Sequence, residues 1–220
     1  MKVINLSEQP SMLSEYMKEI RSVEIQKDRM RFRRNIERIG EVMAMEISKT
    51  FGYVQQPVQT PLGTAQAQVV KNDIVLATIL RAGLPFHQGF LNMMDHAQNA
   101  FLSAYRRMGT DEQGNPKMEI VSEYIAAPAL EGKTLILVDP MLATGMSMEV
   151  AYKALLSHGE PAQLHVACVL GTPQAIQYLE DNMPPQTILW CAAIDPVLNE
   201  HKYIVPGFGD AGDLCFGDKL

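Results

Sequence analysis

The chain has 220 residues, of which 47% are hydrophobic and 20% are charged, and its formal net charge at pH 7 is −6. This composition excludes an intrinsically disordered chain, and the excess of acidic residues disfavours binding along a nucleic-acid backbone. The sequence has no apolar run of 18 residues and carries acidic residues where a leader peptide would be apolar. We therefore expect a cytoplasmic protein that binds neither nucleic acid nor membrane.

The cysteines are three in number and show no CxxC spacing: Cys168, Cys191 and Cys215. Disulfide frameworks and structural zinc sites need paired or clustered cysteines, so neither is predicted. The length is that of one main domain, which can bury enough apolar surface to fold without such a cross-link.

A helical pattern occupies the N-terminal region. From Ser22 to Thr50 the apolar residues recur near every 3.6 positions, and Gly52 follows as glycine follows many helix ends. We predict one long amphipathic helix here, within a helical region 11–51. The arginines between 31 and 34 could form a nucleic-acid stripe, but acidic residues alternate with them, which favours a solvated helix face.

Beyond Gly52 the chain reads first as a hairpin, "VQTPLGTAQAQVV", and then as a series of short apolar runs with helix-length segments between several of them. Their hydrophobicity is continuous rather than alternating, which is typical of strands covered on both faces. The predicted fold is α/β, with a mostly parallel central sheet flanked by helices. The expected strands are 74–80, 100–106, 134–140, 164–170 and 187–194, and the clearest helices are 147–156 and 173–180.

One interval does not fit this series. Residues 106–127 are polar and glycine-rich at their centre, which predicts a projecting hairpin or flexible arm instead of a crossover helix.

The stretch "LILVDPMLATGMS", Leu135 to Ser147, begins as a buried strand and ends in small and hydroxyl residues before a helix. Such a turn presents backbone N–H groups and the positive end of a helix dipole, which together bind phosphate. Thr144 and Ser147 can add hydroxyl donors, and a negative Asp139 suits sugar hydroxyls. The same residues also serve as ordinary turn and cap residues. Because the P-loop lysine and the GxGxxG glycines are missing, a ribose 5-phosphate is favoured over ATP or NAD.

Arginines follow two other expected strands. Arg81 comes directly after Leu80, and Arg106 comes directly after Tyr105. Ligands of parallel sheets bind at the carboxyl ends of the strands, where these residues would meet the phosphate turn. An arginine in a turn is commonly solvated, but two of them beside a phosphate site suit a substrate that carries both a monophosphate and a diphosphate.

The C-terminal stretch "LNEHKYIVPGFGDAGDLCFGDKL" mixes glycines with aromatic and acidic residues. Glycine lets a backbone approach a flat ligand closely, so this segment is a candidate base site; the alternative is a loose tail. His201 lies in it, and a surface position is as well supported for that residue as a role in the site.

Together these motifs resemble those of the uracil phosphoribosyltransferases, a branch of the type I phosphoribosyltransferases. The resemblance runs in order through "TPLG", "ILRAGL", "YR", "LVDPMLATG" and "LNEHKYIVPGFGDAGD", over nearly the whole chain. It implies a single domain over 1–220, with N-terminal helices 11–51, a flexible arm 106–127 and a C-terminal uracil-binding hood 195–220. The implied reaction, in pyrimidine salvage, joins uracil to 5-phospho-α-D-ribose 1-diphosphate (PRPP) with Mg²⁺, giving uridine monophosphate and diphosphate.

The resemblance also implies roles for single residues. Arg81 and Arg106 would bind the diphosphate and, with Asp210, would be the catalytic residues. Asp210 would also lie near the metal, directly or through water. Uracil would be held largely by backbone groups of Ile204, Gly209, Asp210 and Ala211. The loop around the ribose 5-phosphate of PRPP would be Asp139, Pro140, Met141, Leu142, Ala143, Thr144, Gly145, Met146 and Ser147. No side chain is an obvious base for uracil.

Three positions depart from the family pattern. Met146 and Lys202 stand where glycines are usual, and Phe208 replaces a common leucine. Because methionine does not take a positive φ cheaply, either Met146 is helical or the phosphate loop is altered. These departures keep open an alternative, a diverged nucleotide-binding regulator of the same fold with weak or no transferase activity.

Two expectations concern partners. The long N-terminal helix and the projecting hairpin exceed what one sheet needs for cover, so we expect a homodimer or a larger homo-oligomer. The substrates would be uracil and PRPP, and GTP is a candidate effector.

Overall fold

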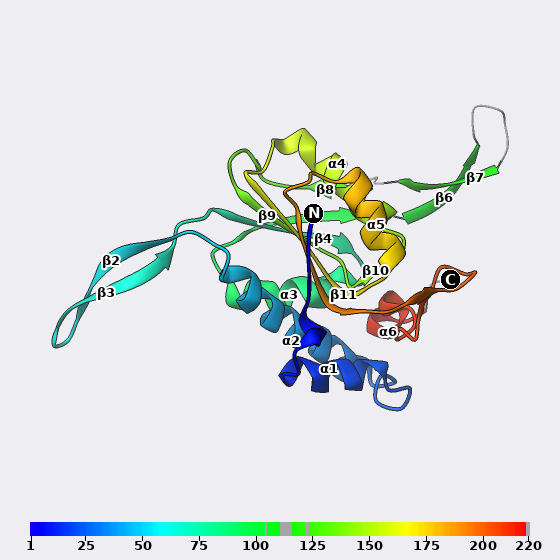
Figure 1. Ribbon diagram of the computed structural model, residues 1–220, viewed down its shortest axis with the longest axis horizontal. Coiled ribbons are helices and arrows are strands. Elements are labelled where there is room, and N and C mark those ends of the chain that lie inside the picture. Colours follow the sequence, from blue (N-terminus) through cyan, green and yellow to red (C-terminus); the bar gives the residue numbers. More distant parts are fainter. Residues whose placement is uncertain (104, 111–115, 122–123, 219–220) are drawn as a thin grey trace.

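The structure is a computed structural model that describes residues 1–103, 105–110, 116–121 and 124–218, with only the backbone described between 105 and 121 (Figure 1). Its centre is an eight-stranded sheet in which every pair is parallel except β5 with β8. The strands in spatial order are β1 (Lys2–Asn5), β12 (Ile188–Ile194), β11 (Gln163–Gly171), β9 (Thr134–Val138), β4 (Ile74–Leu80), β5 (Gln98–Ser103) and β8 (Ile125–Ala126), with β10 (Met141–Leu142) on β11.

Helices cover both faces of this sheet, as Figure 1 shows. Side chains alternate between the two faces along each strand, so Leu76 packs in one core while Val75 and Ala77 pack in the other. The first core lies under α1 (Met12–Arg21), α2 (Arg29–Ser48) and α3 (Gly83–Met93), and the second under α4 (Met146–Leu155) and α5 (Pro173–Asn182). The predicted α/β architecture is confirmed.

The N-terminal helical region differs from the prediction. The continuous helix expected from Ser22 is wrong, because α2 begins only at Arg29. Asp28 explains this: its carboxylate accepts hydrogen bonds from the N–H groups of Met30 and Arg31 and so caps a new helix start. Gly52 is not the helix-ending glycine either, since Lys49 is the C-cap and the N–H of Gly52 donates to Asn72 instead.

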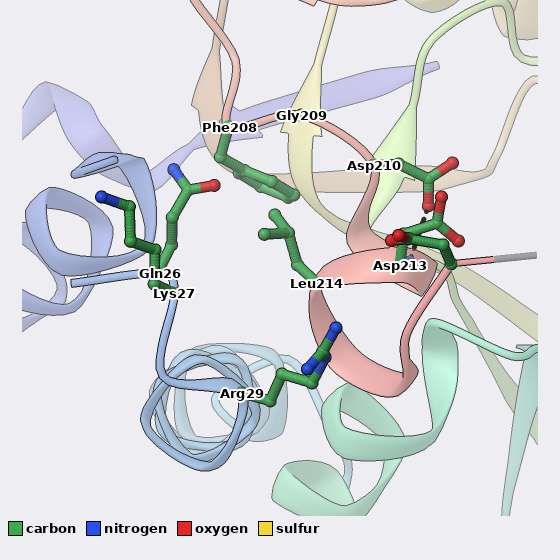
Figure 2. Close-up of a pocket in the computed structure, with 9 residues that line it drawn as sticks. Gln26, Lys27, Arg29, Phe208, Gly209, Asp210, Asp213 and Leu214 are labelled. Carbon is green, nitrogen blue, oxygen red and sulfur yellow. Dashed lines mark hydrogen bonds between the residues drawn. The ribbon is translucent and has the colours of Figure 1, made fainter. Parts of the chain in front are cut away.

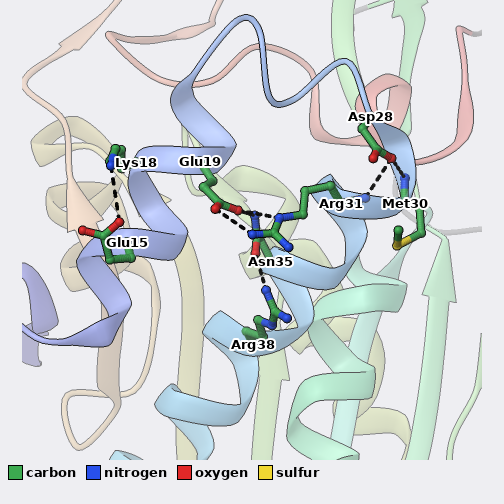
Figure 3. A network of polar contacts seen from close by, with 8 residues as sticks. All are labelled: Glu15, Lys18, Glu19, Asp28, Met30, Arg31, Asn35 and Arg38. Atoms are coloured by element: carbon green, nitrogen blue, oxygen red, sulfur yellow. Dashed lines mark hydrogen bonds and ion pairs between the residues drawn. The ribbon is translucent and has the colours of Figure 1, made fainter.

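A polar network joins the two N-terminal helices (Figure 3). Glu19 accepts two hydrogen bonds of 2.7 Å from Arg31 and one of 2.6 Å from Asn35. These hydrogen bonds, that of Arg31 first, lower the pKa of Glu19 to about 2. Arg34 likewise pairs with Glu37, so these two arginines of α2 make ion pairs within the chain.

Two antiparallel hairpins extend from the body at different ends in Figure 1. The first, β2 (Tyr53–Thr60) with β3 (Gly63–Val70), is exposed along nearly all of its length. The second, β6 (Tyr105–Thr110) with β7 (Pro116–Val121), lies in the interval predicted as a projecting hairpin. Both hairpins confirm the sequence interpretation, whereas β1 and α3 were not foreseen.

Cys168, Cys191 and Cys215 are free and buried. Among the described residues, no helix is long and apolar enough to cross a membrane.

Candidate active site

A cleft of about 840 Å³ opens at the carboxyl ends of the parallel strands. Its wall comes from five segments: the end of β4, the end of β5, the loop after β9, the turn 201–203 and the segment 209–212. This is the edge at which α/β proteins bind their ligands.

The loop after β9 forms one side of the cleft. The carbonyl oxygen of Pro140 accepts hydrogen bonds from the N–H groups of Val169 and Leu170, which fastens the loop to β11. Gly145 then takes a φ of +83° as the N-cap of α4, and Met146 is the first helical residue. Because the first N–H groups of a helix have no partner within it, the N-terminus of α4 offers an anion site beside Thr144 and Ser147.

Side chains of α4 and α5 support this loop from behind. Thr172 donates to the carbonyl oxygen of Ala143 at 2.9 Å. Gly145 has little room: a Cβ there would lie 2.9 Å from Cδ1 of Tyr178. The hydroxyl of Tyr178 in turn donates to Glu149, and this hydrogen bond, together with burial, raises the pKa of Tyr178 to about 12. The loop 139–147 is therefore held in place by packed side chains.

Asp139 lies on the cleft wall at the end of β9. Burial of its carboxyl raises the pKa to about 7, and the single N–H group of Met141, 3.4 Å away, lowers it only in part. The carboxyl is thus more easily protonated than the negative Asp139 expected from the sequence, and in its acid form it can donate a hydrogen bond.

Arg81 faces the cleft from the end of β4. Its Nη2 lies 3.1 Å from a carboxylate oxygen of Asp213, and 3.5 Å from the carbonyl oxygen of Gly217. Asp213 belongs to the short helix α6 (Ala211–Phe216), so this ion pair ties the phosphate side of the cleft to the C-terminal segment.

The C-terminal segment is held by polar contacts and by apolar residues that join the first core. Asp195 pairs with both guanidinium nitrogens of Arg21, at 2.7 and 2.8 Å, and also accepts from the N–H of Gly207. Between these anchors lies the short pair β13 (Val197–Leu198) and β14 (Ile204–Val205). Phe208 is buried with its ring edge on Phe32, at 5.6 Å between ring centroids. Asp210 caps α6 by accepting from the N–H of Asp213 at 3.0 Å.

A second pocket of about 360 Å³ lies behind this segment, with Phe208 and Leu214 between Lys27 and Asp213 (Figure 2). It shares Gly209 and Asp210 with the cleft, so these two residues form the thin wall between the two spaces.

The structure brings most of the predicted site residues together. Eleven of them line the cleft: Arg81, Asp139, Met141, Leu142, Ala143, Thr144, Gly145, Ser147, Gly209, Asp210 and Ala211. Pro140, Met146 and Ile204 do not line it, and Pro140 and Ile204 are buried beside it. Arg106 lies on β6, whose side chains are outside the description.

Sequence reasoning missed some contributors. Ser103 and Tyr203 line the cleft, and Glu149 and Tyr178 support its loop. No motif marks Tyr178 or Glu149, because their contact joins two separate helices.

Comparison with known proteins agrees with this geometry. A sequence model described as uracil phosphoribosyltransferase matches residues 7–218. A uracil phosphoribosyltransferase of Porphyromonas gingivalis is 54% identical over 220 residues, covering all of both chains.

The chain belongs to the uracil phosphoribosyltransferase family. It is an enzyme of that family. A more distant relative, the uracil phosphoribosyltransferase of Thermococcus kodakarensis, is 34% identical over 192 residues, which cover 86% of this chain and 80% of the relative.

Solved structures share the fold of this chain. A protein from Aquifex aeolicus superposes with a TM-score of 0.82 at 26% identity and covers 98% of both chains. An adenine phosphoribosyltransferase from Trypanosoma brucei, at 13% identity and a TM-score of 0.53, shares the fold over 94% of this chain and 87% of its own.

The structure shows the backbone at both positions where the family usually has glycine. Met146 is helical, so the phosphate loop keeps an ordinary helix start and the first of the two alternatives holds. Lys202, in contrast, takes a φ of 64°, the left-handed conformation that favours glycine.

Proposed function

We propose that this chain transfers the 5-phosphoribosyl group of PRPP to uracil, giving uridine monophosphate and diphosphate. The observation that carries the proposal is the single cleft in which the N-terminus of α4 faces Arg81 and the glycine-rich segment 209–212. A phosphate site, a cation and a backbone-lined space are what the two phosphate ends and the flat base of these substrates require.

In this proposal the loop Asp139–Ser147 holds the ribose 5-phosphate. The N–H groups at the start of α4 and the hydroxyls of Thr144 and Ser147 would donate to the phosphate oxygens. Asp139 would bond the ribose hydroxyls, and its raised pKa suits a group that both donates and accepts there. Pro140, which does not line the cleft, contributes through its backbone by fastening the loop to β11.

Arg81 and Arg106 would bind the diphosphate and stabilise it most strongly as it leaves. As the bond from the anomeric carbon to the diphosphate oxygen breaks, negative charge builds on the diphosphate, and a guanidinium already in place stabilises it. Arg81 must first exchange Asp213 for the substrate, because the two are paired at 3.1 Å.

Mg²⁺ fits this site only together with the substrate. The described residues contain no group of three His, Cys, Asp or Glu side chains that could enclose a metal ion. Magnesium commonly binds to one or two carboxylates plus substrate phosphates, and Asp210 lies on the cleft wall as such a carboxylate. Asp210 would hold the ion directly or through water, and the ion would add positive charge beside the diphosphate.

The uracil site would lie on the C-terminal segment. Gly209 and Ala211 line the cleft, and Ile204 is buried directly behind it. Backbone N–H and C=O groups of this segment would bind the edge of the base, with Asp210 between base and diphosphate. Closing the segment over both substrates would exclude the water that could otherwise attack the ribosyl cation.

Three further parts of the proposal concern the oligomeric state, the cellular location and an effector. We infer a homodimer or larger homo-oligomer from the β2–β3 hairpin, whose Val54, Val58 and Leu62 are exposed, because an isolated two-stranded hairpin is marginal in water. A cytoplasmic location and an effector such as GTP stay predictions.

The experiment is an assay of purified protein with PRPP, Mg²⁺ and [¹⁴C]uracil, and parallel assays with cytosine, hypoxanthine and guanine. We expect uridine monophosphate from uracil and no comparable product from the other bases. Equal turnover of a purine base, or no nucleotide at all, would contradict the proposal. Light scattering at micromolar concentration tests the oligomer, which a monomeric mass would exclude.

A further inference from the structure

Lys202 has an unusual backbone for a lysine. Its φ of 64° makes it the one non-glycine residue with positive φ in the described part of the chain. The turn around it enforces this conformation: Lys202 N–H donates to the carbonyl oxygen of Asn199, and the side chain of Asn199 accepts from the N–H groups of His201 and Tyr203. A residue with a Cβ pays a penalty here that glycine avoids, and such penalties concentrate at functional sites.

The side chain of Lys202 stands on the wall of the substrate cleft. It is exposed, and within the described residues its ammonium group makes no hydrogen bond or ion pair. The other cationic side chain described on this wall, Arg81, is paired with Asp213. Lys202 therefore brings an uncommitted positive charge to a cleft whose wall also carries Asp139 and Asp210.

We propose that Lys202 is a further substrate-binding residue, whose ammonium group binds a phosphate oxygen of PRPP. This inference rests on the proposed function, because it needs a phosphorylated substrate in this cleft. An ammonium on a flexible stem reaches a phosphate as a point charge and needs no fixed geometry. Arg81 gives up Asp213 when it binds substrate, whereas Lys202 gives up only water, so it can act at the first encounter.

The test compares Lys202→Gly, Lys202→Asn and Lys202→Arg with Lys71→Asn, which removes one exposed lysine before β4, at the opposite end of that strand from Arg81. We expect the KM for PRPP to rise about tenfold in the Gly and Asn variants, as for the loss of one charged contact, with the KM for uracil unchanged. Lys202→Arg and Lys71→Asn should stay within about twofold of wild type. The Tm of Lys202→Gly should be at least that of wild type, because glycine accepts φ = 64° freely.

Inhibition by diphosphate and by uridine monophosphate identifies the phosphate group involved. Weaker inhibition by either product in Lys202→Gly supports the proposal. Wild-type KM for PRPP together with unchanged inhibition by both products would overturn it. If the wild type makes no nucleotide, the proposed function is refuted. Calorimetric titration of wild type and variants with PRPP and Mg²⁺ then still decides the role of Lys202, because it measures PRPP binding without turnover.

Discussion

The two sides of the cleft are built differently. The phosphate loop is fastened by buried contacts: Gly145 is packed under Tyr178, and Thr172 bonds the loop carbonyl of Ala143. The C-terminal side combines buried residues such as Phe208 with two ion pairs, Asp195 on Arg21 and Asp213 on Arg81. In the proposed function the 5-phosphate keeps its shape from substrate to product, so a rigid site would serve it throughout. The base would enter and leave on the other side, where ion pairs can exchange at a smaller cost than buried packing.

The largest expected effect separates the two roles of Asp210 on the C-terminal side. Asparagine caps a helix as well as aspartate does, so Asp210→Asn should keep α6 and the stability of the fold. If the charge of Asp210 holds Mg²⁺ against the diphosphate, kcat should fall on the order of 10²-fold with a changed Mg²⁺ dependence. Steady-state kinetics across Mg²⁺ concentrations measure this.

Asp218→Asn is the matched control, because Asp218 borders the second pocket and not the cleft. It should stay within about twofold of wild type. Wild-type turnover by Asp210→Asn at every Mg²⁺ concentration would refute the metal role and leave Asp210 as a cap.

The next effect concerns the anchor of the C-terminal side. Burial alone would raise the pKa of Asp195, but hydrogen bonds from Arg21 and from the N–H of Gly207 outweigh it, so the folded pKa lies below its ordinary value of 3.8. Asp195→Asn leaves Arg21 partly buried without its bidentate partner, and we expect a loss of about 2 kcal/mol in the free energy of unfolding. The KM for uracil should also rise. Denaturant unfolding measures the loss of stability, and steady-state kinetics measure the KM.

The pH dependence of this pair has a definite sign. A carboxyl with a lowered folded pKa stabilises the fold fully above its unfolded pKa, and that contribution is lost as pH falls from about 3.8 through the folded pKa. In this acid range the free energy of unfolding should change less steeply with pH for Asp195→Asn than for wild type. Parallel curves would mean that folding does not lower the pKa of Asp195.

A smaller effect is expected on the phosphate side. Tyr178→Phe removes the hydrogen bond to Glu149 but keeps the ring on Gly145, so it should cost about 1 kcal/mol of stability. The KM for PRPP should rise less than threefold. Tyr178→Ala also removes the ring and should raise this KM further; equal kinetics for the two variants would show that packing on Gly145 does not position the loop.

The smallest effect belongs to Met146. Because Met146 is already helical, Met146→Gly should keep PRPP affinity and turnover within about an order of magnitude. Titration with PRPP measures it. A large gain in affinity would show that the methionine distorts the loop after all.

The sequence by itself determined the elements whose signals are local. Continuous apolar runs such as 74–80 and 134–138 became buried parallel strands, because a strand covered on both faces needs no polar alternation. The small residues between Asp139 and Ser147 form the turn before α4. This turn could be predicted because caps and turns depend on residues that are close in the sequence. The family resemblance rested on these local motifs.

Tertiary structure decided what depends on residues far apart. The periodicity after Ser22 continues past Asp28, yet the capping carboxylate divides the region into two helices that fold back and join through Glu19 and Arg31. Arg21 and Asp195, 174 positions apart, show no pattern in the sequence. Neither the raised pKa of Asp139 nor the positive φ of Lys202 follows from residue type, because burial and turn closure are set by the segments packed around a residue.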